Sequence, residues 1–160
     1  MSYVNADGLN VLVHGDQGVV QDKGTVKSGV VQTLVYNIAD ATAIGSTFGA
    51  SDIDPQDPVI PAGAYIKAAY IISETTFTSG GAATLTVGLY NAAGTAIDAD
   101  GIDATVAIAA LTAADVVACD GALAGGVLTV GAADAYVGAI YGTAVYTAGA
   151  AKVVIEYITV

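Results

Sequence analysis

Residues 83–90 carry the clearest alternation of apolar and polar side chains along the chain. Two sets of side chains point in opposite directions: Ala83, Leu85, Val87 and Leu89 against Thr84, Thr86, Gly88 and Tyr90. A period of two residues predicts a strand with one buried face. Residues 64–77 differ because both faces are apolar: Ile66, Ala68, Tyr70 and Ile72 on one, Tyr65, Ala69 and Ile71 on the other.

The sequence Thr78-Ser79-Gly80-Gly81 lies between these two segments, and its glycines favour a turn. We therefore expect residues 64–77 and 83–91 to pair as a hairpin in the middle of a β-sandwich. The second apolar face of residues 64–77 would then be covered by the chain's own second sheet or by a neighbouring subunit.

Further short strands are predicted at regular intervals. Their ranges are 30–38, 95–97, 102–109, 116–119, 127–130, 135–141 and 153–157. In the 102–109 strand we expect Ile102, Ala104, Val106 and Ile108 to point inward and Asp103, Thr105 and Ala107 outward. One helical turn is expected at residues 111–115. About eight strands without a helical period predict an all-β, antiparallel, jelly-roll-like β-sandwich, with an immunoglobulin-like sandwich as the alternative.

Two stretches lack a sustained period. Residues 1–29 contain several glycines and two lysines, Lys23 and Lys27. They would form either an extended N-terminal arm that orders against a partner, or a first strand followed by a loop. Residues 30–160 would form the sandwich domain. Within it, residues 39–63 make a long acidic connection with three prolines, a length typical of functional or disordered loops.

The charge balance excludes several classes of partner. The 160 residues include 15 acidic residues and four lysines but no arginine, giving a formal net charge of −11. Binding to nucleic acid or to an anionic membrane surface needs basic side chains, so neither is expected. The N-terminus lacks the features of a signal peptide, which predicts synthesis and folding in a cytoplasm. Residues 135–151 carry no charge, yet they are short and rich in glycine, so we expect strand and no membrane span.

Few residues could support catalysis. His14 is the single histidine and Cys119 the single cysteine. Acid–base triads and zinc sites need several such groups together, so we expect no enzyme activity. His14 would be a surface or contact residue. Cys119 follows an apolar run and would be a small buried hydrophobe.

The acidic turns resemble calcium loops only superficially. Asp98, Asp100 and Asp103 are closely spaced, but the twelfth position is Ala109, where an EF-hand has glutamate. We expect a turn with solvated carboxylates there, with a weak cation site as the alternative, and the same for residues 52–57. Gly80-Gly81 and Gly125-Gly126 lack a following lysine and would be turns. No catalytic, cofactor-binding or metal-binding residue, and no cofactor, is therefore predicted.

Apolar side chains also occupy the predicted outer faces of the last strands. Val153, Ile155 and Tyr157 face one way, while Val154, Ile158 and Val160 share the other with Lys152 and Glu156. Nine tyrosines suit positions that are half apolar and half wet, such as protein interfaces. Either another subunit or the chain's own loops would cover these faces.

Four stretches together resemble the small capsid decoration (cement) proteins of tailed bacteriophages. They are Val59-Ile60-Pro61-Ala62-Gly63-Ala64-Tyr65-Ile66, residues 83–90, Gly94-Thr95-Ala96-Ile97-Asp98 and residues 146–157. The resemblance spans about residues 30–160. It implies a β-sandwich or jelly-roll module, often trimeric, that sits on the outside of an icosahedral head and ties major capsid subunits together. It carries over no catalytic residue.

On this interpretation, the N-terminal segment up to Gly29 and the acidic residues 52–58 are the candidate contacts with the major capsid protein. Two alternatives remain. One is a phage fibre or spike head, or a carbohydrate-binding β-sandwich that stacks tyrosines on sugars. The other is a small enzyme, for which the sequence offers no nucleophile–base pair.

Overall fold

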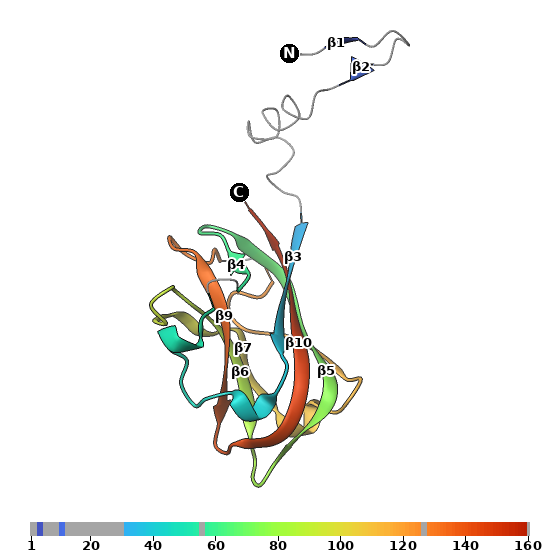
Figure 1. The fold of residues 1–160 in the computed structure, drawn as a ribbon, viewed down its shortest axis with the longest axis vertical. Coiled ribbons are helices and arrows are strands. Elements are labelled where there is room, and N and C mark those ends of the chain that lie inside the picture. Colours follow the sequence, from blue (N-terminus) through green and yellow to red (C-terminus); the bar gives the residue numbers. More distant parts are fainter. Residues whose placement is uncertain (1–2, 5–9, 12–30, 55–56, 126–127, 160) are drawn as a thin grey trace.

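A computed structural model describes residues 3–4, 10–11, 31–54, 57–125 and 128–159. Two four-stranded antiparallel sheets form a sandwich (Figure 1). The first, the β10 sheet, has the order β3 (Val31–Ile38), β10 (Tyr146–Ile158), β5 (Tyr65–Ser79), β8 (Val116–Ala118). The second, the β6 sheet, has the order β4 (Val59–Ile60), β9 (Ala135–Gly142), β6 (Thr84–Tyr90), β7 (Ala96–Ala107). These two orders are those of an eight-stranded jelly roll, which confirms the predicted fold class.

Three short 3₁₀ turns and one further strand pair complete the described elements. The turns are η1 (Ala41–Ala43), η2 (Ala50–Asp52) and η3 (Ile108–Ala110). In the N-terminal segment, β1 (Tyr3–Val4) and β2 (Asn10–Val11) pair antiparallel, with Tyr3 opposite Val11. Most of residues 1–29 lie outside the described residues, so the N-terminal arm remains a prediction.

Side chains from the inner faces of both sheets form the core. The predicted buried face of residues 83–90 is confirmed, because Leu85, Val87 and Leu89 are fully buried, whereas Gly88 and Tyr90 of the opposite face are buried as well. From the opposite sheet, Val153 and Ile155 of β10 are also fully buried. Burying an aliphatic side chain of this size contributes about 1.5–3 kcal/mol, so facing strands of this kind are the main source of stability.

The predicted pairing of residues 64–77 with 83–91 is wrong. β5 pairs with β10 and β8, whereas β6 pairs with β9 and β7. The glycine-rich connection after β5 carries the chain from one sheet to the other. β5 and β6 therefore lie in opposite sheets and face each other across the core, so their apolar faces are buried without a hairpin.

The predicted faces of β5 also need correction. Ala69 and Ile71 are buried by the chain's own second sheet, so no neighbouring subunit is needed to cover them. Ile66 is buried with them, while Tyr70 is 37% exposed on the opposite face. The cause is a register shift opposite Glu156, which moves Ile66 onto the inner face.

The 102–109 prediction is partly wrong for a similar reason. Ile102 and Val106 are buried as expected, but Ala104 is exposed and the Asp103 side chain is only 3% exposed. Leu85 of β6 pairs with Val106 of β7, and Val87 pairs with Asp103. Two residues of β6 therefore match three residues of β7, which is a bulge in β7. Each extra residue in a bulge makes the side chains beyond it point to the opposite face of the sheet.

The remaining comparisons with the sequence predictions concern three short segments. Residues 111–115 form a turn closed by the Asp115 amide and the Thr112 carbonyl, and the 3₁₀ turn η3 precedes it. Of the predicted strand 127–130, residue 127 is outside the described residues, and the rest makes only an isolated bridge between Thr129 and Tyr65. Residues 135–151 form β9 and the start of β10. Within the described part of the chain, no helix is long and apolar enough to span a membrane.

The long connection 39–63 is largely ordered against the sandwich. Asp40 begins η1 by accepting a hydrogen bond from the Thr42 amide at 2.9 Å. Further on, the Gly45 carbonyl accepts a hydrogen bond from the Tyr141 amide of β9 at 3.0 Å. The connection thereby bridges from β3 in one sheet to β9 in the other, at the open side of the sandwich.

Candidate functional site

The residues with potential chemistry do not gather into a catalytic site among the described residues. His14 and Gly126 lie outside them. Cys119 is half-buried, and burial together with the negative charge of Asp103 raises the pKa of its thiol to about 12. At neutral pH the thiol is therefore protonated and a poor nucleophile.

Asp98, Asp100 and Asp103 all lie in the bulged part of β7 but in different environments. The Asp103 carboxylate accepts a hydrogen bond from the Thr105 amide at 3.2 Å. It also accepts hydrogen bonds from the Asp120 amide and the Cys119 thiol. Asp103 is thus a buried structural group, which corrects the prediction of a solvated carboxylate, whereas Asp100 is exposed.

The three carboxylates do not gather into a group that could hold a metal ion. Burial raises the pKa of Asp98, and the neighbouring Asp100 raises it further. Across the described residues, no three His, Cys, Asp or Glu side chains lie close enough to bind a metal ion. This finding includes the described members of residues 52–57.

The Asp103→Asn substitution should raise the free energy of unfolding, and the gain over wild type should be larger at neutral pH than at low pH. Burial first, and the charge of Asp120 second, raise the pKa of Asp103. The folded state therefore holds this proton more tightly than the unfolded chain. Wild type loses stability as the pH rises from the unfolded value near 3.8 through the raised folded value. Asparagine cannot ionise and escapes this loss.

The measurement is urea unfolding of both proteins between pH 3 and pH 7, reported as the difference in free energy of unfolding. Asp115→Asn is the matched control, since Asp115 is exposed to solvent. A difference that stays constant across this pH range would contradict the prediction.

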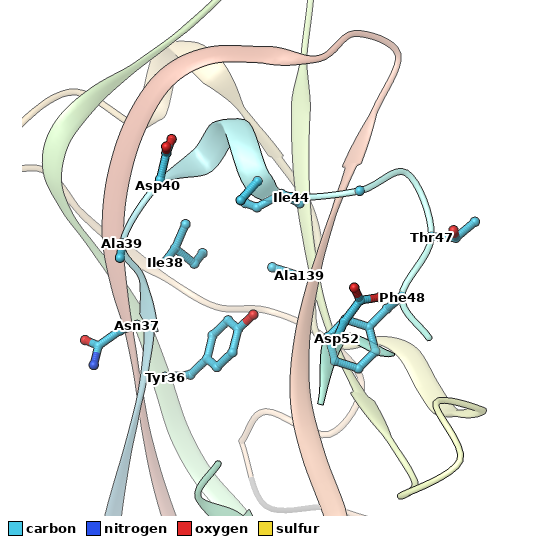
Figure 2. Close-up of a pocket in the computed structure, with 12 residues that line it drawn as sticks. Tyr36, Asn37, Ile38, Ala39, Asp40, Ile44, Thr47, Phe48, Asp52 and Ala139 are labelled. Carbon is cyan, nitrogen blue, oxygen red and sulfur yellow. The ribbon is translucent and has the colours of Figure 1, made fainter. Parts of the chain in front are cut away.

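A pocket of about 320 Å³ lies at the open side of the sandwich. The end of β3, the connection through η1 and η2, and Ala139 of β9 enclose it (Figure 2). Its floor is apolar: Ile38 and Ala139 are buried, and Ile44 packs against the core. Sequence reasoning missed this pocket, because its residues come from a connection with no periodic pattern.

Aromatic rings form one wall of this pocket. The Phe48 ring stacks on Tyr90 with ring centroids 4.4 Å apart. Both rings cover Gly138 of β9, where a Cβ atom would come within 2.8 Å of them. Glycine at this position therefore lets Phe48 lie close against the sheet.

The Tyr36 hydroxyl group points toward the middle of the pocket (Figure 2). It makes no hydrogen bond to any described residue. Burial raises the pKa of Tyr36, and the negative charges of Asp57 and Asp52 raise it further. The pocket is thus a site of negative potential with one hydroxyl group free to bind a ligand.

A second surface feature is the solvent-facing side of the β10 sheet, here called the outer β10 face. Register aligns Val35, Val154 and Tyr70 across three strands, and Ile72 lies beside Val116 in the next row. Val35 is 40% exposed and Val116 61% exposed. Lys152 and Glu156 lie on the same face, and within the described part of the chain these two valines are left exposed.

Comparisons with known proteins bear on the fold. No family model matches the chain, and no curated protein matches it. Among solved structures, a chain from the capsid of Ralstonia phage GP4 is similar, with a TM-score of 0.56 and 20% sequence identity. The similarity covers 83% of this chain and 86% of that chain, so the two are also close in length. At this identity the likeness establishes a shared β-sandwich fold.

Proposed function

We propose that the protein is a non-catalytic structural component of a tailed-phage virion, a decoration protein on the outside of the capsid. The observation that carries this proposal is the likeness to a phage capsid chain over most of both chains. Similar length supports a role as a small separate module. The absence of a catalytic grouping among the described residues is compatible with such a role.

The surface chemistry fits a protein that adheres to other proteins. The net charge of −11 disfavours nucleic acid and anionic membranes as partners. The outer β10 face offers exposed aliphatic and tyrosine side chains, which are typical of protein interfaces. We propose that this face joins copies of the chain into a homotrimer.

The major capsid protein is the proposed partner of this assembly. A decoration protein stabilises a shell by binding the assembled form and not its dissociated subunits, so its effect follows mass action. The N-terminal segment up to Gly29 and the acidic residues 52–58 are the proposed contacts. The segment directly precedes β3 in the sequence.

Deleting residues 2–28 should abolish binding to capsids while leaving the jelly roll folded. The strands of the sandwich all begin at or after Val31, so the deletion removes none of these strands. Binding is measured by co-sedimentation with phage heads assembled without the protein. Circular dichroism and thermal unfolding report on the fold of the truncated chain.

This experiment tests the decoration function and the role of the N-terminal segment separately. If the full-length chain does not bind such heads, or binds host polysaccharide instead, the decoration function is wrong. If the full-length and truncated chains bind equally well, only the role of the N-terminal segment is wrong.

A further inference from the structure

The pocket at the open side of the sandwich combines an apolar floor with aromatic and acidic edges. Ile38 and Ala139 lie at its base, and the Phe48 and Tyr36 rings stand at its sides (Figure 2). Asp52 lies beside Phe48 at the edge of the pocket and accepts a hydrogen bond from the Gly49 amide at 2.8 Å. This bond fixes the carboxylate in position and leaves its other oxygen available.

No lysine among the described residues neutralises the negative charge at this pocket. Asp40 and Asp52 line it, and Asp57 lies near enough to influence Tyr36. The lysines of the described chain are Lys67 and Lys152, and neither lines the pocket. Lys152 is paired with Glu74. A ligand that enters the pocket is therefore favoured if it carries positive charge.

We propose that this pocket binds an arginine side chain presented by a partner protein. The aliphatic stem of the guest packs on Ile38 and Ile44, and its planar guanidinium group stacks on the Phe48 ring. From there it donates hydrogen bonds to the Asp52 carboxylate and to the Tyr36 hydroxyl oxygen. A neutral apolar guest would leave this hydroxyl unpaired and the carboxylates uncompensated.

Arginine suits the pocket better than lysine for two reasons. Its planar group stacks on aromatic rings, and its several N–H groups can reach two acceptors at once, whereas an ammonium group is a compact, strongly hydrated charge. The chain itself contains no arginine, so the guest comes from a different protein and not from another copy of this one. The inference rests on the proposed function only for the identity of that protein as a capsid component.

The test is a titration of the full-length protein with Nα-acetyl-arginine amide, followed by methyl NMR. The isoleucine methyl signals of Ile38 and Ile44 and the Ala139 methyl signal should shift and saturate, with a dissociation constant on the order of 1–10 mM for so small a ligand. Nα-acetyl-citrulline amide has the same shape without the charge and should bind about tenfold more weakly. Nα-acetyl-lysine amide should also bind more weakly than the arginine probe.

Two variants locate the interaction. Asp52→Asn keeps an oxygen to accept the Gly49 amide bond, and it should weaken arginine binding by about fivefold. Asp115→Asn removes the same charge at an exposed position that does not line the pocket, and affinity should not change. Neither variant removes a core side chain, so both should fold.

Equal binding of citrulline and arginine, or an unchanged affinity in Asp52→Asn, would overturn the proposal. Stronger binding of lysine would do so as well, and it would direct attention to Lys23 and Lys27 of this chain. The titration needs no capsid, so the proposed capsid function can fail while the pocket still binds arginine, and the reverse.

Discussion

Replacing Gly88 by alanine should destabilise the jelly roll by about 3 kcal/mol or more, at the upper end of the usual cost of overpacking. Gly88 lies in the middle of β6. A Cβ atom there would stand 2.1 Å from the Ala99 carbonyl oxygen and 2.6 Å from that of Asp98. These are backbone atoms and cannot rotate away, so β7 itself would have to move.

The close approach follows from the pairing of β6 with β7. Val87 lies opposite Asp103 and Leu89 opposite Asp98, so residues 99–102 of β7 face Gly88 alone. The extra residues of β7 pass close over β6 at Gly88, which has no side chain. The bulge that carries the acidic residues therefore depends on this glycine.

Gly80→Ala is the matched control for this prediction. No atom lies within 4 Å of a Cβ atom built at Gly80, so the same substitution should change stability by less than about 0.5 kcal/mol. Urea unfolding of both variants supplies the comparison. A Gly88→Ala protein as stable as Gly80→Ala would show that β7 is not held against β6 as described.

The strands of this fold were predictable where the chain alternates without interruption. In residues 83–89 the apolar side chains at every second position, Ala83, Leu85, Val87 and Leu89, lie in the core, as the period of two predicts. The turn at residues 91–94 was also predictable, because Asn91 closes it locally by accepting hydrogen bonds from the Ala93 and Thr95 amides. Local chemistry and local pattern suffice for such elements.

Bulges and sheet crossings were not predictable in the same way. Asp103 was expected outside because a regular strand would place it there, yet one extra residue turned it inward. The position of Gly88 among residues with side chains was a signal of close backbone approach that could have indicated the bulge. Which sheet receives β6 after β5 depends on long-range pairing, and a short glycine-rich turn allows either outcome.

The candidate pocket could not be predicted from the sequence for a related reason. Tyr36 and Ile38 come from an identified strand, but Phe48 and Asp52 come from the connection after it, and Ala139 from a strand far along the chain. Only the jelly-roll topology brings β3 and β9 to the same open side of the sandwich. The sequence did indicate that residues 39–63 form a long connection, of a length typical of functional or disordered loops.

Val154→Glu should convert the proposed trimer into monomers without unfolding the chain. Val154 lies between Val35 and Tyr70 at the centre of the outer β10 face. In the monomer the new carboxylate can reach water, so its effect on stability should stay within about 1 kcal/mol. In a trimer it would be buried beside Val35 and Tyr70, and the nearby Lys152 is already paired with Glu74, so the new charge would be unpaired and cost several kcal/mol. Light scattering after size-exclusion chromatography should therefore give the mass of one chain.

The control is Ala107→Glu, which adds the same charge at an exposed position on β7 in the opposite sheet. Ala107→Glu should keep the mass of the wild-type assembly, which separates a local effect at the outer β10 face from the general effect of added negative charge. A wild-type protein that is already monomeric at the same concentration, or a Val154→Glu protein that remains assembled, would contradict the role of this face. A monomer produced by Val154→Glu alone would instead identify it as the contact between copies, because no buried core position is altered.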